Sequence, residues 1–160
     1  MSDDNSSSGF APGPRWFEDY VTGAVHELGR ITVEAEEVQA FARQFDPQPF
    51  HTDPQAAAQT NFGGLIASGW HTGSMMMRLL ALNYLSPESS LGSPGIEELR
   101  WPRPVRPGDV LTVRVTVVDT RVSKSRPDRG IVRSLIEVLN QNGEIVMTAN
   151  PANLVLCRPV

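Results

Sequence analysis

"GWHTGSMMMRLLALNYL", residues 69–85, is the stretch that decides the fold. As a helix it would be apolar on most of its circumference, and such a helix belongs in the interior of a protein. Ser86-Pro87 closes it, because proline cannot continue a helix. Arg78 interrupts the apolar run, which is shorter than the roughly 20 residues that a membrane span needs. We therefore predict one long buried helix and no membrane segment.

Strand-like segments lie on both sides of this helix. Before it, "ELGRITV" reads as a first strand, and after it come four runs rich in Val, Leu, Ile and Thr with partial alternation. These later runs cover residues 95–105, 109–122, 130–141 and 144–157. The turn signals "VRPGDV" and "NQNGEI" separate them, the second an Asn-Gly hairpin. The order predicts an α+β fold in which an antiparallel sheet wraps around the long central helix.

Two shorter helices are predicted ahead of the long one. The first, "EAEEVQAFARQF", residues 34–45, has apolar residues at helical spacing. Pro47 disfavours helical geometry at the residue before it, so this helix should stop at Asp46. The second, "DPQAAAQT", residues 53–60, has Asp53 as a cap and Pro54 at its first position.

Composition places the chain among single-domain proteins without a nucleic-acid partner. It has 160 residues and a formal net charge of −4, and nucleic-acid binding would require a basic face. Residues 1–14 are rich in Ser, Gly, Pro and Asp and should form a disordered tail, with one domain over residues 15–160. The start lacks the basic and apolar regions of a signal peptide, so we expect a cytoplasmic protein.

The stretch "FDPQPFH", residues 45–51, holds an acid and an imidazole at a fixed separation. Pro47 and Pro49 each fix a φ angle and are expected to exclude a helix there, leaving a stiff extended or turned link. A pre-positioned Asp46 and His51 would suit general acid–base catalysis. The alternative is an aspartate that stops one helix and a histidine that lies just before the next.

Gly69 opens the long helix, so its backbone N–H has no acceptor within the helix. Such a donor, at the positive end of the helix dipole, can stabilise an oxygen that becomes negative during a reaction. The alternative is a glycine that is present only for close packing. The residues alone leave both interpretations open.

Residues 41–80, "FARQFDPQPFHTDPQAAAQTNFGGLIASGWHTGSMMMRLL", resemble the hydratase-2 motif of MaoC-like dehydratases, the (R)-specific enoyl-CoA hydratases of hot-dog fold. "RPVRPGD", residues 103–109, is similar to a second motif of that family, and the resemblance covers roughly residues 28–158. It implies a hot-dog fold. It also places the family's catalytic aspartate and histidine on Asp46 and His51, and its oxyanion glycine on Gly69.

Two positions depart from the family pattern. Gln48 stands where the family usually has asparagine, and Ser68 replaces the histidine before the oxyanion glycine. Both are expected near the substrate. Trp70 and Met76 are further candidates to bind the acyl chain, since methionine adapts to variable shapes; core packing is the alternative, as it is for the adjacent Met75 and Met77.

The resemblance implies reversible hydration of trans-2-enoyl thioesters to (R)-3-hydroxyacyl thioesters, with CoA or an acyl carrier as the thiol. No metal site and no redox cofactor are expected, since the thioester itself acidifies the α-carbon. The family also implies a homodimer with the site at the junction between chains. A basic loop of Lys124, Arg126 and Arg129 could hold the CoA phosphates, although a solvated loop is the simpler interpretation.

Two other functions remain open. A hot-dog thioesterase would attack the thioester carbonyl, but such enzymes usually place an acid on the central helix, and residues 69–85 contain neither Asp nor Glu. The second alternative is a non-catalytic protein that binds acyl thioesters. The departures at Gln48 and Ser68 leave this second alternative open.

Overall fold

The computed structural model describes residues 10–160. Of the tail predicted over residues 1–14, residues 1–9 lie outside this described part. The ring of Phe10 stacks on His26, with 4.1 Å between ring centroids and 7° between planes. Phe10 thus already packs against the body of the protein.

Five antiparallel strands form one sheet with the order β1-β3-β4-β5-β2. They are β1 (Val25–Thr32), β2 (Gly95–Arg100), β3 (Val110–Val122), β4 (Arg129–Leu139) and β5 (Ile145–Leu156), with a short 3-10 helix η1 (Phe17–Asp19) ahead of β1. The predicted antiparallel sheet is confirmed. β1 and β2 form its two edges.

The central strands show the alternation that a half-buried sheet requires, because successive side chains point to opposite faces. In β3 the buried side chains are Leu111, Val113, Val115 and Val117. The predicted Asn-Gly turn joins β4 to β5, with Gly143 at a φ of 75°, a conformation that glycine adopts without steric cost. One face of the sheet is therefore a continuous apolar surface.

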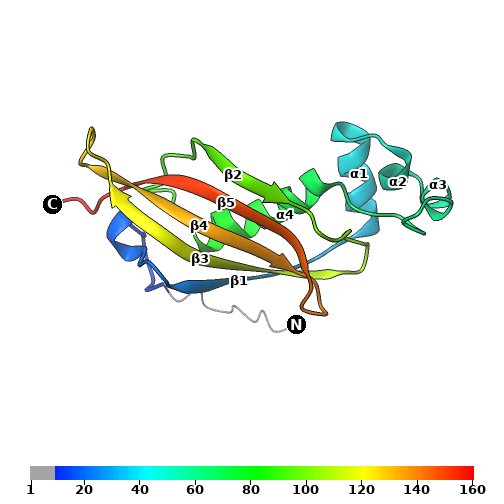
Figure 1. Cartoon of the computed structure of the whole chain (residues 1–160), viewed down its shortest axis with the longest axis horizontal. Helices are drawn as coiled ribbons and strands as arrows, with labels where there is room; N and C mark the ends of the chain where they lie inside the picture. Colours follow the sequence, from blue (N-terminus) through cyan, green and yellow to red (C-terminus); the bar gives the residue numbers. More distant parts are fainter. Residues whose placement is uncertain (1–9) are drawn as a thin grey trace.

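The long helix α4 (Gly69–Asn83) lies along this apolar face, inside the curve of the sheet (Figure 1). The residues that it buries are His71, Thr72, Met75, Met76, Leu79 and Leu80. This is the hot-dog arrangement that the resemblance implied, and the α+β prediction is confirmed. No helix within residues 10–160 combines the length and apolar character needed to cross a membrane.

The expectation that α4 is buried around most of its circumference is wrong. Trp70, Met77 and Leu82 are 61%, 43% and 62% exposed. The sheet covers one side of the helix, and in a single chain the opposite side faces solvent.

Three short helices, α1 (Ala35–Phe45), α2 (Pro49–Thr52) and α3 (Pro54–Ala58), gather at one end of the molecule, near the start of α4 (Figure 1). We call this the helical end. α1 stops before Asp46, as predicted. Residue Phe45, in the apolar pattern of α1, is nevertheless 65% exposed.

The prediction that the two prolines exclude a helix before residue 53 is wrong. Pro49 begins α2, because the first position of a helix needs no N–H donor and suits the fixed φ of proline. His51 therefore lies within a helical turn rather than ahead of one. The predicted cap of α3 is confirmed: Asp53 Oδ1 accepts hydrogen bonds from the backbone N–H groups of Gln55 and Ala56, at 2.9 and 3.3 Å.

Candidate active site

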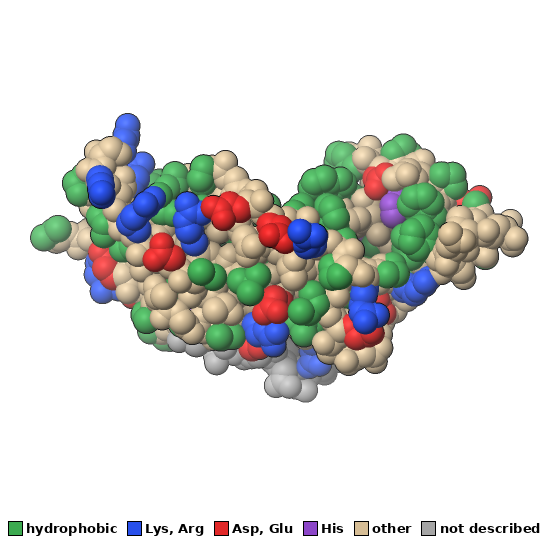
Figure 2. Space-filling model, viewed as in Figure 1, with side chains coloured by type: hydrophobic (Ala, Val, Ile, Leu, Met, Phe, Trp, Pro, Cys, Tyr) green, Lys and Arg blue, Asp and Glu red, His purple; other side chains and the backbone are tan. Residues whose placement is uncertain are grey.

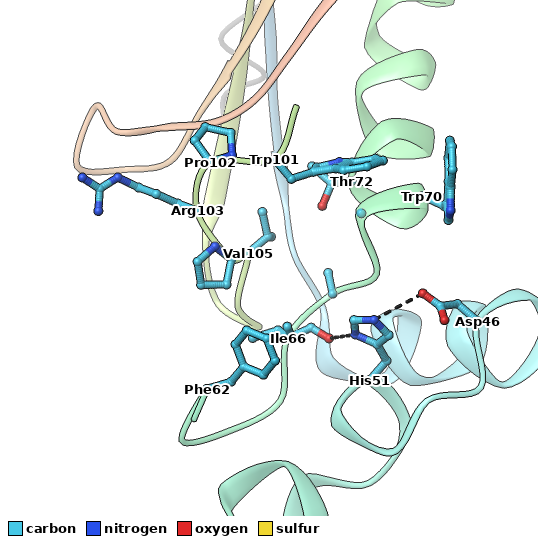
Figure 3. Close-up of a pocket in the computed structure, with 13 residues that line it drawn as sticks. Asp46, His51, Phe62, Ile66, Trp70, Thr72, Trp101, Pro102, Arg103 and Val105 are labelled. Atoms are coloured by element: carbon cyan, nitrogen blue, oxygen red, sulfur yellow. Dashed lines mark hydrogen bonds and ion pairs between the residues drawn. The ribbon is translucent and has the colours of Figure 1, made fainter. Parts of the chain in front are cut away.

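The side chains of Asp46 and His51 approach each other at the link between α1 and α2. Asp46 is the C-cap of α1, and His51 is the third residue of α2. His51 Nε2 lies 3.2 Å from Asp46 Oδ2 (Figure 3). The structure thus brings the acid and the imidazole together across Pro47 and Pro49.

The orientation of the His51 ring is fixed from the side opposite Asp46. His51 Nδ1 lies 2.8 Å from the backbone oxygen of Ile66. A carbonyl oxygen can only accept, so Nδ1 carries the hydrogen and donates it. In the neutral ring the lone pair is then on Nε2, which faces Asp46. Residue type gave no signal for this contact, because the Ile66 partner is a backbone atom.

Two neutral side chains donate hydrogen bonds to the Asp46 carboxylate. The Ser68 hydroxyl donates to Oδ2 at 2.7 Å, and the Gln48 amide donates to Oδ1 at 2.7 Å. The Ser68 hydrogen bond lowers the pKa of Asp46 below its ordinary value, although burial opposes the shift; the Gln48 amide and, when the ring is protonated, the charge of His51 lower that pKa further. Asp46 is therefore a stable anion that gives up its charge with difficulty.

Ser68 lies behind the carboxylate rather than in the wall of the cavity. It is fully buried and is the N-cap of α4, where its Oγ accepts a hydrogen bond from Trp70 N at 3.3 Å. The same hydroxyl donates to Asp46. In this arrangement Ser68 joins the start of α4 to the carboxylate, and a contact with substrate stays a prediction. Gln48 likewise contacts Asp46 rather than the cavity.

Gly69 has both features that the sequence left as alternatives: an N–H donor without an acceptor, and close packing that needs glycine. Among residues 10–160, none accepts a hydrogen bond from its N–H. A Cβ placed on Gly69 would lie 2.6 Å from Cε2 of the Trp101 indole, so only glycine allows this approach. The glycine thus leaves an N–H donor available and also makes room for Trp101.

These groups open into a cavity of about 370 Å³, a size that suits a small-molecule site. Figure 2 shows the surface hollowed between the body of the sheet and the helical end, with hydrophobic side chains around the depression. Trp70 and Trp101 form an edge-to-face pair in its wall, 5.3 Å between centroids. The lining residues are Asp46, His51, Phe62, Ile66, Ala67, Gly69, Trp70, Thr72, Trp101, Pro102, Arg103, Pro104 and Val105.

The two residues predicted to bind the acyl chain, Trp70 and Met76, lie in different places. Trp70 lines the cavity, whereas Met76 does not: its side chain is buried in the core beneath the sheet. Successive helical residues point about 100° apart, so of the three methionines Met75 and Met76 pack inward and Met77 faces solvent. Thr72 and Trp101 line the cavity without having been predicted.

The basic loop is the turn between β3 and β4. In Figure 2 its Lys and Arg side chains gather at the end of the molecule away from the helical end. Arg129 is paired with Asp128 at 2.9 Å. Within one chain, these cations are therefore remote from the cavity. No three His, Cys, Asp or Glu side chains come together as metal ligands in the part of the chain that the structure describes.

Comparison with known proteins agrees with this fold. A sequence profile of the MaoC like domain family matches residues 20–138. The crystal structure of a MaoC-like dehydratase from Rhodospirillum rubrum is 46% identical, with a TM-score of 0.85 over 91% of this chain and 99% of that one. The R-hydratase PhaJ1 from Pseudomonas aeruginosa is 27% identical, with a TM-score of 0.74 over 89% of this chain and 86% of that one.

A named dehydratase is also similar in sequence. The 3-hydroxyacyl-thioester dehydratase Z of Mycobacterium tuberculosis is 30% identical in an alignment of 149 positions, gaps included, that covers 84% of this chain and 87% of that protein. Its match, like those of the two structures, spans most of both chains. The chain therefore belongs to the MaoC like domain family.

Proposed function

We propose that the protein catalyses the reversible hydration of trans-2-enoyl thioesters to (R)-3-hydroxyacyl thioesters. Membership of the MaoC-like family and likeness to hydratases support an enzyme of the hydro-lyase class. The observation that carries the proposal is the Asp46–His51 pair, which opens into a cavity that Gly69 also lines.

In the proposed reaction, the nucleophile is a water that lies beside the pair and contacts both Asp46 and His51. His51 Nε2 accepts a proton from the water as its oxygen bonds to C3 of the enoyl group. The electrons of the C2=C3 bond move to the thioester oxygen. His51 then returns the proton to C2, so one water supplies both the hydroxyl group and the hydrogen.

The environment of each group supports this division of roles. The Nδ1–H of His51 is occupied by Ile66 O, which leaves Nε2 to accept the proton. Asp46 remains an anion because Ser68 and Gln48 donate to it, and it stabilises the imidazolium that forms. The negative oxygen of the intermediate would accept a hydrogen bond from Gly69 N–H. The reaction needs no metal or redox cofactor, because the thioester acidifies C2.

We further propose that the protein functions as a homodimer. The exposed apolar residues of α4 and the edge position of β2 support this, because a free strand edge and an apolar helix face favour pairing with another chain. Trp70 belongs to that face and also lines the cavity, so a partner would lie close to the site. Light scattering should give the mass of two chains; the mass of one would reject the dimer.

Crotonyl-CoA, a short trans-2-enoyl-CoA, tests the reaction. The wild-type protein should convert it to (R)-3-hydroxybutyryl-CoA, identified by chiral analysis. Asp46→Asn and His51→Gln should each lower kcat by about 10²-fold or more, as expected for a lost acid–base group. Asp119→Asn, an exposed position on β3, is the matched control and should be fully active.

Each of the other outcomes points to a different function. Full activity in either site variant would reject the dyad. Release of free thiol would indicate a thioesterase, and binding of enoyl-CoAs without turnover at every chain length would indicate a non-catalytic binder.

A further inference from the structure

The cavity has a positively charged end that the proposed chemistry does not use. Asp46 and His51 lie at one side of the lining residues and Arg103 at the other (Figure 3). The guanidinium of Arg103 points away from the dyad. Among the lining residues, Arg103 is the only Lys or Arg, so the one permanent positive charge of the lining lies at the end of the cavity away from the dyad, which we call its outer end.

Arg103 already holds an anion in the absence of a ligand. Its Nη1 lies 3.0 Å from Glu144 Oε2, on the turn between β4 and β5. The side chains are 57% and 37% exposed, and exposed ion pairs of this kind contribute little to stability. Arg103 can therefore exchange Glu144 for an anionic group of a ligand at little cost.

The neighbouring cations are less suited to this role. Arg106 donates to the backbone oxygen of Phe62, which holds that side chain beside the 60–66 loop. The β3–β4 turn lies at the end of the molecule opposite the helical end (Figure 2). A guanidinium presents a planar fork of donors that matches a phosphate, and Arg103 has this fork at the outer end of the cavity.

The chemistry of acyl thioesters suggests which anion this is. In both CoA and acyl carrier proteins, a long pantetheine arm separates the thioester sulfur from a phosphate. A thioester bound at the dyad would place that phosphate at the outer end of the cavity rather than beside Asp46. We propose that Arg103 binds the phosphate of the 4′-phosphopantetheine arm, displacing Glu144. This inference rests on the proposed function, because it needs the thioester to bind at the dyad.

Three crotonyl thioesters test the assignment: those of pantetheine, 4′-phosphopantetheine and CoA. Pantetheine has the same arm without the phosphate. Arg103→Gln should raise KM for the two phosphorylated substrates by about tenfold or more, as expected for a lost charged hydrogen bond. It should leave KM for the pantetheine thioester, and kcat for all three, unchanged. Glu144→Gln should lower KM for the phosphorylated pair only.

Arg126→Gln, in the β3–β4 turn, is the matched loss of one positive charge and should change none of these values. Equal effects of Arg103→Gln on all three thioesters would overturn the assignment, as would an effect on CoA alone, which would place the contact on the nucleotide. An effect of Arg126→Gln in place of Arg103→Gln would move the phosphate to the turn.

Binding separates this inference from the proposed reaction. Calorimetry with CoA, 4′-phosphopantetheine and pantetheine measures affinity without turnover. If wild type hydrates none of the thioesters, the proposed reaction fails, yet Arg103→Gln should still weaken binding of the two phosphorylated ligands alone. Unchanged affinity in that variant would overturn the role of Arg103, whatever the activity.

Discussion

The sheet together with α4, which we call the body, and the helical end are stabilised by different kinds of contact. In the body, β3, β4 and α4 share a continuous apolar core in which many side chains are almost completely buried. Stability there is the sum of many interchangeable contacts, each worth a fraction of a kcal/mol. The alternating pattern of the strands is enough to specify it.

The helical end depends on a few hydrogen bonds that can be named one by one. Ser68 donates to Asp46, Ile66 O accepts from His51, and Asp53 caps α3. α1, α2 and α3 follow one another closely in the sequence, and prolines lie at the junctions between them. A single lost donor here changes the position or charge of a reactive group rather than the overall fold.

The candidate site lies where these two regions meet. Gly69 begins α4 and contributes its N–H, while Trp101 follows β2 and closes the wall from the side of the sheet. The rigid body thus supplies the fixed donor and the wall, and the helical end supplies the titratable groups. Substitutions in the two regions should therefore separate stability from activity.

The largest effect on stability is expected in the body. Ile136 on β4 is 1% exposed, and Ile136→Ala should lower the free energy of unfolding by about 2–5 kcal/mol because it leaves a cavity. Below its unfolding transition, the folded enzyme should keep its kcat. Urea denaturation and kinetics check both values, with the exposed Val118→Ala on β3 as a control that should change stability by at most about 0.5 kcal/mol. A large loss of kcat in the folded Ile136 variant would contradict the separation.

At the junction, the Gly69 N–H can be removed with little change in backbone shape. Proline suits the first position of a helix, and the Ser68 backbone, at φ −56° and ψ 140°, is already compatible with a following proline. The added ring would meet Trp101, so the comparison is made in a Trp101→Ala background. There Gly69→Pro should have about 10²–10³-fold lower kcat than Gly69→Ala, which keeps the N–H. Equal kcat in the two double variants would reject the oxyanion role.

The same division explains what the sequence could and could not predict. Strands, hairpin and central helix follow from periodicity and turn residues, which report local geometry directly. The proximity of Asp46 to His51 could be anticipated because it is local in sequence and stiffened by Pro47 and Pro49. The other contacts of the site join residues that are far apart in the sequence.

Those contacts left no trace in residue type. The Ile66 carbonyl that orients His51 is a backbone atom, and the approach of Trp101 to Gly69 depends on where the segment after β2 lies relative to the start of α4. Residue type does not predict the short helix at Pro49, because proline can either break a helix or occupy its first position. Met76 was misplaced because spacing alone does not say which side of α4 the sheet covers.

Ser68 belongs to both regions, and two substitutions separate its roles. Ser68→Ala should cost about 0.5–2 kcal/mol in stability as a lost N-cap, whereas Ser68→Gly should cost only a few tenths. Both remove the donor to Asp46 and should raise the pKa of that carboxyl equally. Because its pKa lies below the ordinary value in the folded protein, Asp46 loses its charge at a lower pH than an ordinary aspartate. In either variant, the part of the fall in kcat/KM that comes from protonation of Asp46 should begin at a higher pH than in wild type. A pH profile that is unchanged in both variants would contradict this role of the hydroxyl.

The smallest effect is expected at Gln48, which is exposed and touches only the outer oxygen of the carboxylate. Losing its hydrogen bond to Asp46 should cost roughly 0.5–1.5 kcal/mol of transition-state stabilisation, so Gln48→Ala should lower kcat/KM by about two- to tenfold. Stability should stay within about 0.5 kcal/mol of wild type, because the position is on the surface. Gln48→Glu sharpens the comparison, since a second negative charge would raise the pKa of Asp46 and reduce activity further at low pH. Hydrogen exchange in α2 and α3 checks the alternative. Faster exchange there in Gln48→Ala would show that the amide stabilises the fold of the helical end and does not act on the Asp46 carboxylate alone.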